Sequence, residues 1–217
     1  RKVKYLICDM YNPYINYTKR YFPNSIAIID SFHVVSWILS KINHYINDVK
    51  KKFQIRDKKL YEEYCKKNNK PIDFKNTPVS KEVYLLNNFK WLLLQNVENI
   101  DYQNTPRYNH KLKAYLNTYD YEKMFFQLDV SFMPIRRLKE KYIEFNKTKE
   151  KDLNKVSALL NDLIILYSQS ALIMFKEFSD LLKKHKQEII NSFIYVTDTD
   201  GNERRLSNGP MEGYNRT

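Results

Sequence analysis

Glycine is nearly absent from this chain, and its distribution limits the folds that the sequence can adopt. The 217 residues contain three glycines, Gly201, Gly209 and Gly213, all near the C-terminus. Sandwiches and barrels of many short strands need frequent tight turns, in which glycine supplies the positive φ angles. A chain that has glycine at one end only is therefore predicted to consist mainly of long helices.

The N-terminal segment is an exception, because two short apolar runs there have the character of strands. The first extends from Val3 to Asp9, and the second, from Ser25 to Asp30, is apolar on both faces. Between them, Asn12-Pro13 is typical of a helix start, and a short helix is expected from Tyr14 to about Arg20. Two apolar strands joined by a helical crossover are expected to lie side by side and parallel in a covered sheet.

From Phe32 onward the apolar residues follow helical spacing. This pattern, from Val34 to Val49, predicts one long amphipathic helix, which is expected to continue, with a bend, to about Lys67. The further helices are predicted at Ser80–Gln95, Asn109–Thr118, Tyr121–Phe145 and Lys151–Phe193. Pro134 is expected to kink or split the helix that contains it.

The C-terminal segment returns to strand-like and turn-like residues. Residues 193–197 are β-like, 198–202 form a turn signal, and 203–206 are expected to pair back as a hairpin. Gly209-Pro210 is typical of a helix start, which places Glu212 at the third helical position. The chain is therefore predicted to be α/β and predominantly helical, with α/β ends at residues 1–36 and 191–217 and a helical block at residues 37–190.

The balance of charge favours a polyanionic partner. The formal net charge is +12 and the isoelectric point is about 9.4. Such a chain suits nucleic acid or an anionic membrane surface, and charge alone does not choose between them. The two cysteines, Cys8 and Cys65, form no CxxC pair, so a cysteine zinc site is not expected. Polar residues interrupt the most apolar window, residues 158–175, which is therefore predicted to be a buried core helix rather than a membrane span.

Most other polar features have an ordinary structural interpretation. His44, His110 and His185 lie in polar surroundings and are predicted to be surface residues. The leucine-rich stripe at residues 159–167 is predicted to be core. Basic runs such as Arg136-Arg137 are usually solvated faces, although the tyrosines between several of them would also suit contact with DNA.

A few acidic residues stand at the boundaries of predicted elements. Asp9 ends the first strand, at the edge of an open sheet where ligand sites collect, but it is equally suited to capping the next helix. Asp30 ends the second strand, and His33 follows three residues later. This pair can bind a metal or orient a side chain, whereas Asp30 or Ser31 can also simply cap the long helix. Glu212 at a helix start is favoured by the helix dipole and by a capping box.

Taken together, these motifs are more specific than each one alone. The chain resembles the DDE transposases of bacterial insertion sequences, in the ISL-three group, whose pattern is a strand ending in "IDM", an "FPNA-like" turn, "DRFHVV", a helical insertion and "SNG..EG.N". Ser25 stands where the family usually has Ala, and Ser31 where it usually has Arg. The matching segments here are Leu6-Ile7-Cys8-Asp9-Met10, Phe22-Pro23-Asn24-Ser25, Ile28-Ile29-Asp30-Ser31-Phe32-His33-Val34-Val35 and Ser207-Asn208-Gly209-Pro210-Met211-Glu212-Gly213-Tyr214-Asn215.

The resemblance implies an RNase H-like fold with a large all-α insertion, of which this chain is a fragment. Asp9 then matches the second of three catalytic acids and Glu212 the third. Asp30 and His33 match the Asp-x-x-His signature that follows the second acid. The first acid is expected on an upstream strand that these 217 residues do not contain.

The activity implied by the resemblance is metal-dependent cleavage and strand transfer of DNA. Asp9 and Glu212 are expected to be metal ligands in a site for two Mg²⁺ or Mn²⁺ ions, with Asp30 and His33 beside them. The fragment alone is expected to be inactive because one acid is missing. The expected partners are DNA and further copies of the protein in the bacterial cytoplasm, with no membrane. A non-enzymatic, basic, helical nucleic-acid-binding module is the alternative, and a scaffold with no nucleic-acid partner is a third possibility.

Overall fold

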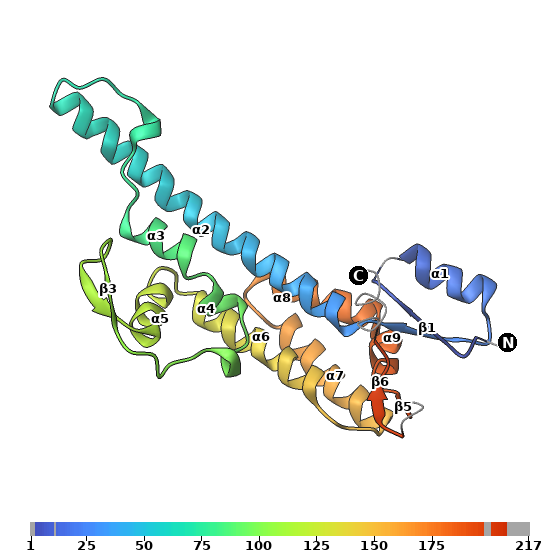
Figure 1. Ribbon diagram of the computed structural model, residues 1–217. Helices are drawn as coiled ribbons and strands as arrows, with labels where there is room; N and C mark the ends of the chain where they lie inside the picture. The colour runs from blue at the N-terminus through green and yellow to red at the C-terminus, as the bar shows by residue number, and fades with distance from the viewer. Residues whose placement is uncertain (1–2, 11, 198–200, 208–217) are drawn as a thin grey trace, which may run out of the picture. The chain divides into compact units, whose positions relative to one another are not determined.

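The structure is a computed structural model that describes residues 3–10, 12–197 and 201–207 (Figure 1). The chain divides into two compact units. The first comprises residues 1–38 and 141–217, and the second comprises residues 39–140. Most of the described residues are helical, as the scarcity of glycine predicts.

The N-terminal strand–helix–strand motif has the predicted parallel pairing. It consists of β1 (Tyr5–Cys8), α1 (Asn12–Tyr21) and β2 (Ile26–Ile29). Tyr5 pairs with Ile26 and Cys8 with Ile29, so both strands end at the same edge of the sheet. Ile28 and Ile29 are almost completely buried, in keeping with a strand that is apolar on both faces.

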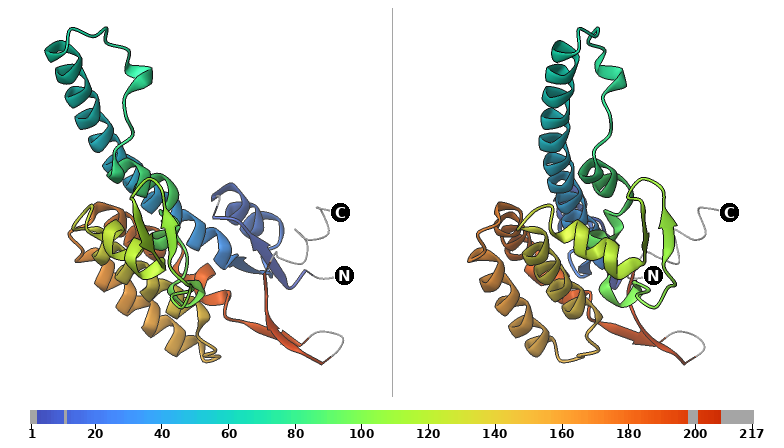
Figure 2. Two further views of the ribbon diagram at one scale, coloured as in Figure 1. Left: turned by 60° about the vertical axis from the view of Figure 1, so that its left-hand side comes forward. Right: turned by 90° about the vertical axis from the view of Figure 1, so that its left-hand side faces the viewer.

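Helices from both ends of the sequence build the core of the first unit. They are the start of α2 (Ser31–Lys67), the end of α6 (Phe132–Lys147), α7 (Leu153–Ser168), α8 (Ile173–Lys184) and α9 (Lys186–Asn191). α7 and α8 lie side by side (Figures 1 and 2). The ring of Phe178 lies at the centre of this core, 5.7 Å from Trp37, 5.0 Å from Tyr142 and 5.4 Å from Tyr167 between centroids.

Helix α9 joins the C-terminal half of the chain to the sheet. It packs against β2, and the side-chain amide of Asn191 donates a hydrogen bond of 2.8 Å to the carbonyl oxygen of Ala27. The predicted C-terminal hairpin follows as β5 (Tyr195–Thr197) and β6 (Glu203–Arg205), which pair antiparallel.

The second unit contains the rest of α2 and the elements between it and α6. These are the 3₁₀ helix η1 (Phe74–Asn76), α3 (Lys81–Asn88), α4 (Trp91–Leu94), the 3₁₀ helix η2 (Val97–Asn99), β3 (Arg107–Asn109), β4 (Ala114–Leu116) and α5 (Thr118–Phe126). α2 extends to Lys67, which is the predicted end of the long helix. Ser80 caps α3 by accepting a hydrogen bond from the backbone N–H of Val83.

The prediction of an all-α block over residues 37–190 is wrong in one place, because β3 and β4 form an antiparallel hairpin where a helix at Asn109–Thr118 was expected. The Asn109 side chain accepts hydrogen bonds from the backbone N–H groups of Lys111 and Leu112, and this competes with helix formation. Lys113 adopts a left-handed conformation with φ 54°, which ends any helical path.

Other predicted helices are interrupted by local capping. The segment Lys151–Phe193 is three helices, because Ser170 accepts a hydrogen bond from the backbone N–H of Leu172 after α7 ends. Ser80–Gln95 breaks between α3 and α4. The predicted split near Pro134 is confirmed: Pro134 lies in the first turn of α6, where its missing N–H costs nothing.

Three assignments of polar and apolar residues to the surface or the core are also wrong. His185 is buried at the junction of α8 and α9, and its pKa is lowered by this burial and by Lys184, against the opposing effect of Glu188. Leu159 and Leu166 are exposed, because the buried face of α7 is narrower than the apolar stripe. Arg136 is buried rather than solvated.

Candidate active site at the carboxyl edge of the sheet

Two carboxylates follow the two parallel strands at the same edge of the small sheet. Asp9 comes directly after β1, and Asp30 comes directly after β2. The backbone N–H of Asp30 donates to the carbonyl oxygen of Cys8 at 3.2 Å, so strand pairing continues to this edge. The carboxyl edge of a parallel sheet is where ligand sites collect, as the sequence interpretation assumed.

Asp9 and His33 come together although they are 24 positions apart in the sequence. The Nε2 atom of His33, in the first turn of α2, lies 2.6 Å from Oδ1 of Asp9. The carboxylate is about half exposed (48%), and the imidazole is 27% exposed. The two atoms are close, but the geometry is not that of a hydrogen bond. The buried Nε2 atom of His33 forms no hydrogen bond with any of the described residues.

Asp30 is buried, and its side chain caps α2. Its Oδ1 atom accepts a hydrogen bond of 2.9 Å from the backbone N–H of Phe32, and its own carbonyl oxygen accepts one of 3.1 Å from the N–H of His33. These bonds satisfy donors that the first turn of a helix leaves without partners. Asp30 therefore fixes the start of the helix that carries His33.

A cleft of about 270 Å³ opens beside Asp9. It lies between β1 and α1 and is lined by Leu6, Ile7, Cys8, Asp9, Tyr14 and Tyr17. Tyr14 and Tyr17 are each 53% exposed. The half-exposed carboxylate thus adjoins an open space with aromatic side chains on one wall.

The electrostatic surroundings of Cys8 show that this edge is negative. Burial of the thiol, followed by the charges of Asp9 and Glu188, raises the pKa of Cys8 to about 11. Glu188 lies on α9, and no motif in the sequence singles it out. Only the packing of α9 on β2 brings this third acidic residue to the region, so sequence reasoning had no signal by which to find it.

The C-terminal hairpin is anchored close to the same edge by Arg205. Its guanidinium donates hydrogen bonds to the carbonyl oxygens of Ser192 (2.8 Å) and Asn146 (2.6 Å). Burial lowers the pKa of Arg205, and the nearby charges of Tyr195, Tyr142 and Asp30 oppose this shift. Arg205, which precedes Glu212 by seven positions, is therefore close enough to Asp30 to feel its charge.

Glu212 itself, with the predicted helix start at Gly209-Pro210, lies outside the described residues. Within residues 3–10, 12–197 and 201–207, no three His, Cys, Asp or Glu side chains form a group that could hold a metal ion. A hard divalent cation prefers oxygen ligands, which the exposed carboxylate of Asp9 can supply. Asp30 fits such an ion less well, because it is buried and one of its oxygens is committed to the backbone.

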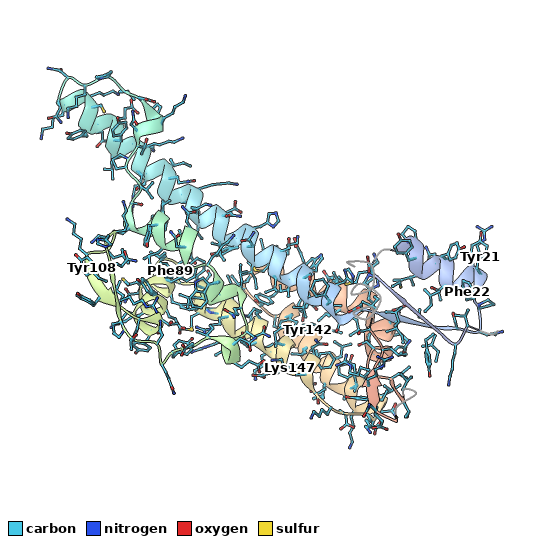
Figure 3. The ribbon with its side chains drawn as sticks, viewed as in Figure 1. Tyr21, Phe22, Phe89, Tyr108, Tyr142 and Lys147 are labelled. Atoms are coloured by element: carbon cyan, nitrogen blue, oxygen red, sulfur yellow. The ribbon has the colours of Figure 1, made fainter. Side chains whose placement is uncertain are left out.

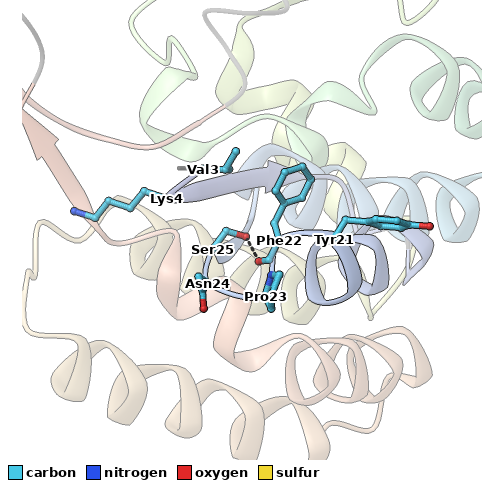
Figure 4. A pocket seen from close by; sticks show the side chains of 7 residues that line it. All are labelled: Val3, Lys4, Tyr21, Phe22, Pro23, Asn24 and Ser25. Atoms are coloured by element: carbon cyan, nitrogen blue, oxygen red, sulfur yellow. Dashed lines mark hydrogen bonds between the residues drawn. The ribbon is translucent and has the colours of Figure 1, made fainter. Parts of the chain in front are cut away.

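A larger cleft of about 560 Å³ lies at the opposite end of β1 and has a different character (Figure 4). Its lining contains no acid and no histidine, and Ser25 donates its hydroxyl hydrogen to the carbonyl oxygen of Phe22 at 2.8 Å. Among the described residues that line it, Lys4 alone is charged, and Figure 4 shows the Lys4 side chain pointing away from the others. The described residues that line this cleft therefore supply no carboxylate and no imidazole, unlike the edge that carries Asp9.

None of the described helices combines the length and the apolar character that a membrane crossing requires. A comparison with curated proteins gives no match, and a comparison with solved structures gives none either. A family model described as "Transposase", of the DDE type and the ISL3 (ISL-three) group, matches residues 1–217, the whole chain. The chain therefore belongs to the ISL3 family of DDE transposases.

Proposed function

We propose that this chain forms part of the catalytic domain of a transposase that cuts and joins DNA by phosphoryl transfer at the edge of the sheet that carries Asp9. In this proposal Asp9 and Glu212 are ligands of two divalent ions, Mg²⁺ or Mn²⁺. The observation that carries it is the contact between the half-exposed carboxylate of Asp9 and His33, at 2.6 Å. A carboxylate that served only as a helix cap would bond backbone N–H groups, as Asp30 does.

Glu212 follows the anchored residue Arg205 by seven positions in the sequence. Arg205 is fixed to the ends of α6 and α9 and feels the charge of Asp30. Seven residues span at most about 25 Å when fully extended. The proposal requires this stretch to bring Glu212 to the edge that carries Asp9, with a helix beginning at Pro210 to orient the Glu212 side chain.

Each described residue has a separate task in the proposed site. Asp9 supplies a negatively charged oxygen where a cation and a DNA phosphate can approach from solvent. His33 is a positioning residue, since its Nε2 atom lies against one oxygen of Asp9 and limits the orientations of the carboxylate. Asp30 holds the turn on which His33 sits.

The proposed reaction does not require a nucleophilic side chain. Divalent ions, when bound, supply an activated water or 3′-hydroxyl and stabilise the departing oxygen. The protein itself has to bind the ions, orient the DNA and exclude other water molecules, so no nucleophilic serine or tyrosine has to be exposed at the edge. The family resemblance assigns the first acid to a position upstream of Asp9, and the 217 residues alone are therefore proposed to cut DNA poorly or not at all.

The other partners in the proposal follow from charge and family. The net charge of +12 favours binding of DNA, both at the ends of the element and at the target. Cutting two ends in one event favours an assembly of several copies, and the proposed location is the bacterial cytoplasm.

The division into a catalytic core at residues 1–36 and 191–217, with an insertion at residues 37–190, also stays a proposal. Residues 141–190 pack with the N-terminal strands in the first compact unit.

The test is a comparison of DNA cutting and DNA binding by the complete transposase. Asp9→Asn and Glu212→Gln are each expected to lower Mg²⁺-dependent strand cleavage by about a thousandfold, because each removes several kcal/mol of charge stabilisation from the site. Affinity for the same DNA, measured by fluorescence anisotropy, should change little. His33→Gln is expected to lower cleavage by about 10- to 100-fold and to raise the Mg²⁺ concentration needed for half-maximal rate.

Full cleavage by Asp9→Asn would remove the basis of the proposal. DNA binding without any Mg²⁺-dependent cleavage by the complete wild-type protein would instead favour a non-enzymatic, basic nucleic-acid-binding module. The purified 217-residue chain serves as a further check. Robust Mg²⁺-dependent cleavage by this chain, abolished in Glu212→Gln, would show that the assignment of a missing upstream acid is wrong.

A further inference from the structure

The β3–β4 hairpin displays two tyrosines on its outer face that its own unit leaves uncovered. Tyr108 and Tyr115 are direct cross-strand partners, so their rings lie on one face with centroids 5.2 Å apart. Tyr108 is 45% exposed and Tyr115 is 72% exposed. Figure 3 shows Tyr108 at the periphery of the unit. The two neighbouring rings together form a small aromatic surface that a ligand can contact.

The opposite face of the hairpin is fixed to the helices beneath it. The Asn109 side chain donates hydrogen bonds of 2.9 Å to the hydroxyl groups of Tyr84 on α3 and Tyr121 on α5. It also accepts the two backbone bonds that shape the turn. At the base, the backbone N–H of Thr118 donates to the side chain of Asn104. The two exposed rings are therefore presented by a rigid support rather than by a loose loop.

The charge beside the two rings is positive. Residues 102–119, which contain the whole hairpin, include no aspartate and no glutamate. Lys111 and Lys113 are exposed in the turn, and His110 lies against Tyr108 with ring centroids 5.0 Å apart. Arg107 is also exposed, but it alternates to the face of the hairpin that carries Asn109. A second copy of the same face would bring these like charges together, so the face is better suited to a polyanion.

We propose that the outer face of the β3–β4 hairpin binds DNA at unpaired bases, which stack on Tyr108 and Tyr115 while Lys111 and Lys113 contact the adjoining phosphates. In duplex DNA the faces of the bases are already stacked and only their edges are accessible. Flat aromatic faces flanked by cations match the bases and backbone of a single strand. The inference rests on the proposed function only in taking DNA as the partner.

The test measures binding of the 217-residue chain to a labelled oligothymidine and to a blunt duplex. Tyr108→Ala with Tyr115→Ala is expected to weaken binding to the single strand about tenfold, because each stacked base contributes substantially to affinity. Affinity for the blunt duplex should fall by less than about twofold. The double variant with phenylalanine at both positions should bind like the wild type, since phenylalanine keeps the stacking face. Lys111→Gln with Lys113→Gln should weaken binding to both DNAs and make it less dependent on salt.

Tyr64→Ala is the matched control, because Tyr64 is an exposed tyrosine on α2 beside Lys70, 50% exposed and outside the hairpin. It should leave affinity for the single strand unchanged, and circular dichroism should show that every variant is folded. The proposal is overturned by unchanged binding in the alanine double variant, or by an equal loss for duplex and single strand. An equal loss in Tyr64→Ala, or a change of oligomeric state in the alanine double variant, overturns it as well. Failure of the proposed function would instead appear as undiminished cleavage in Asp9→Asn, which this binding assay does not involve.

Discussion

Each of the two units contains a cluster of charged side chains, and the two clusters are built in opposite ways. In the second unit Arg136 is 6% exposed and donates hydrogen bonds to Glu122 (2.8 Å) and to the hydroxyl of Tyr102 (2.6 Å). In the first unit Asp9 is about half exposed and contacts His33. A charge that is buried and fully bonded holds a structure together, whereas a charge held at the surface remains available to a ligand.

The titration behaviour of the buried cluster supports this distinction. Burial acts to lower the pKa of Arg136, but the hydrogen bonds with Glu122 and Tyr102 outweigh burial and raise the pKa. Lys139 is completely buried and donates to the carbonyl oxygen of Gln95. Burial lowers the pKa of Lys139, and the contact with Glu140 only partly opposes that effect. Both side chains therefore lie in surroundings that are closed to ligands.

Breaking the buried cluster gives the largest expected change in stability. Arg136→Met leaves the Glu122 carboxylate without its cation in a largely buried place, with only the hydroxyl of Tyr102 still donating to it, so the free energy of unfolding should fall by about 3 kcal/mol. Urea titration followed by circular dichroism measures this change. Arg137→Met is the matched control, because Arg137 is the exposed neighbour and should change stability by less than about 0.5 kcal/mol. Equal effects of the two substitutions would contradict a structural role for Arg136.

The sequence was sufficient to predict the elements that depend on local patterns. The strand pair, its parallel pairing and the long helix α2 all follow from apolar spacing over short windows. That spacing also places Asp9 and Asp30 at one edge, because parallel strands end together. The hairpin at residues 107–116 was missed because the bonds made by the side chain of Asn109 override helical propensity.

The parts that could not be predicted depend on contacts between residues distant in sequence. Arg136 meets Tyr102 across 34 positions, and Lys139 meets Gln95 across 44. A run of basic residues in the sequence does not show which side chain is buried with hydrogen-bond partners and which is exposed to solvent. Glu188 reaches Cys8 only through the packing of α9. The role of Glu212 in the site, which the family resemblance suggests, remains a prediction.

Burial of the Cys8 thiol at the carboxyl edge, together with the charges of Asp9 and Glu188, gives an effect of intermediate size on stability. The pKa of Cys8 is about 11 in the folded chain, against about 9 for an ordinary thiol. Between these pH values the unfolded chain loses the thiol proton and the folded chain keeps it. The free energy of unfolding should therefore fall by about 2 kcal/mol as pH rises through this window. Below pH 9 this contribution is fully present.

Chemical denaturation at several alkaline pH values measures this slope. In the Cys8→Ala variant, the free energy of unfolding should fall by about 2 kcal/mol less over this pH range than in the protein with Cys8. Cys65 is replaced by alanine in both of these proteins, so that no other thiol contributes. The remaining slope comes from tyrosines such as Tyr142 and Tyr167, whose pKa values burial also raises. Identical slopes in the two proteins would show that the edge does not disfavour the thiolate.

The smallest effect decides to which kind of cluster Asp30 belongs. Asp30→Ala removes the cap of α2 and should lower the free energy of unfolding by about 1 kcal/mol, whereas Asp30→Ser keeps an oxygen that can accept from Phe32 and should cost a few tenths. Ser31→Ala is the control and should be nearly neutral, because the bond to Phe32 comes from Asp30. Cleavage assays on the complete transposase complete the test. If Asp30 acts only by capping α2, Asp30→Ser should retain most of the cleavage rate, because serine keeps the cap. If both substitutions abolish cleavage while only Asp30→Ala destabilises the fold, the carboxylate itself takes part in the site. Asp30 would then resemble Asp9, whose charge is available to a ligand, rather than Arg136.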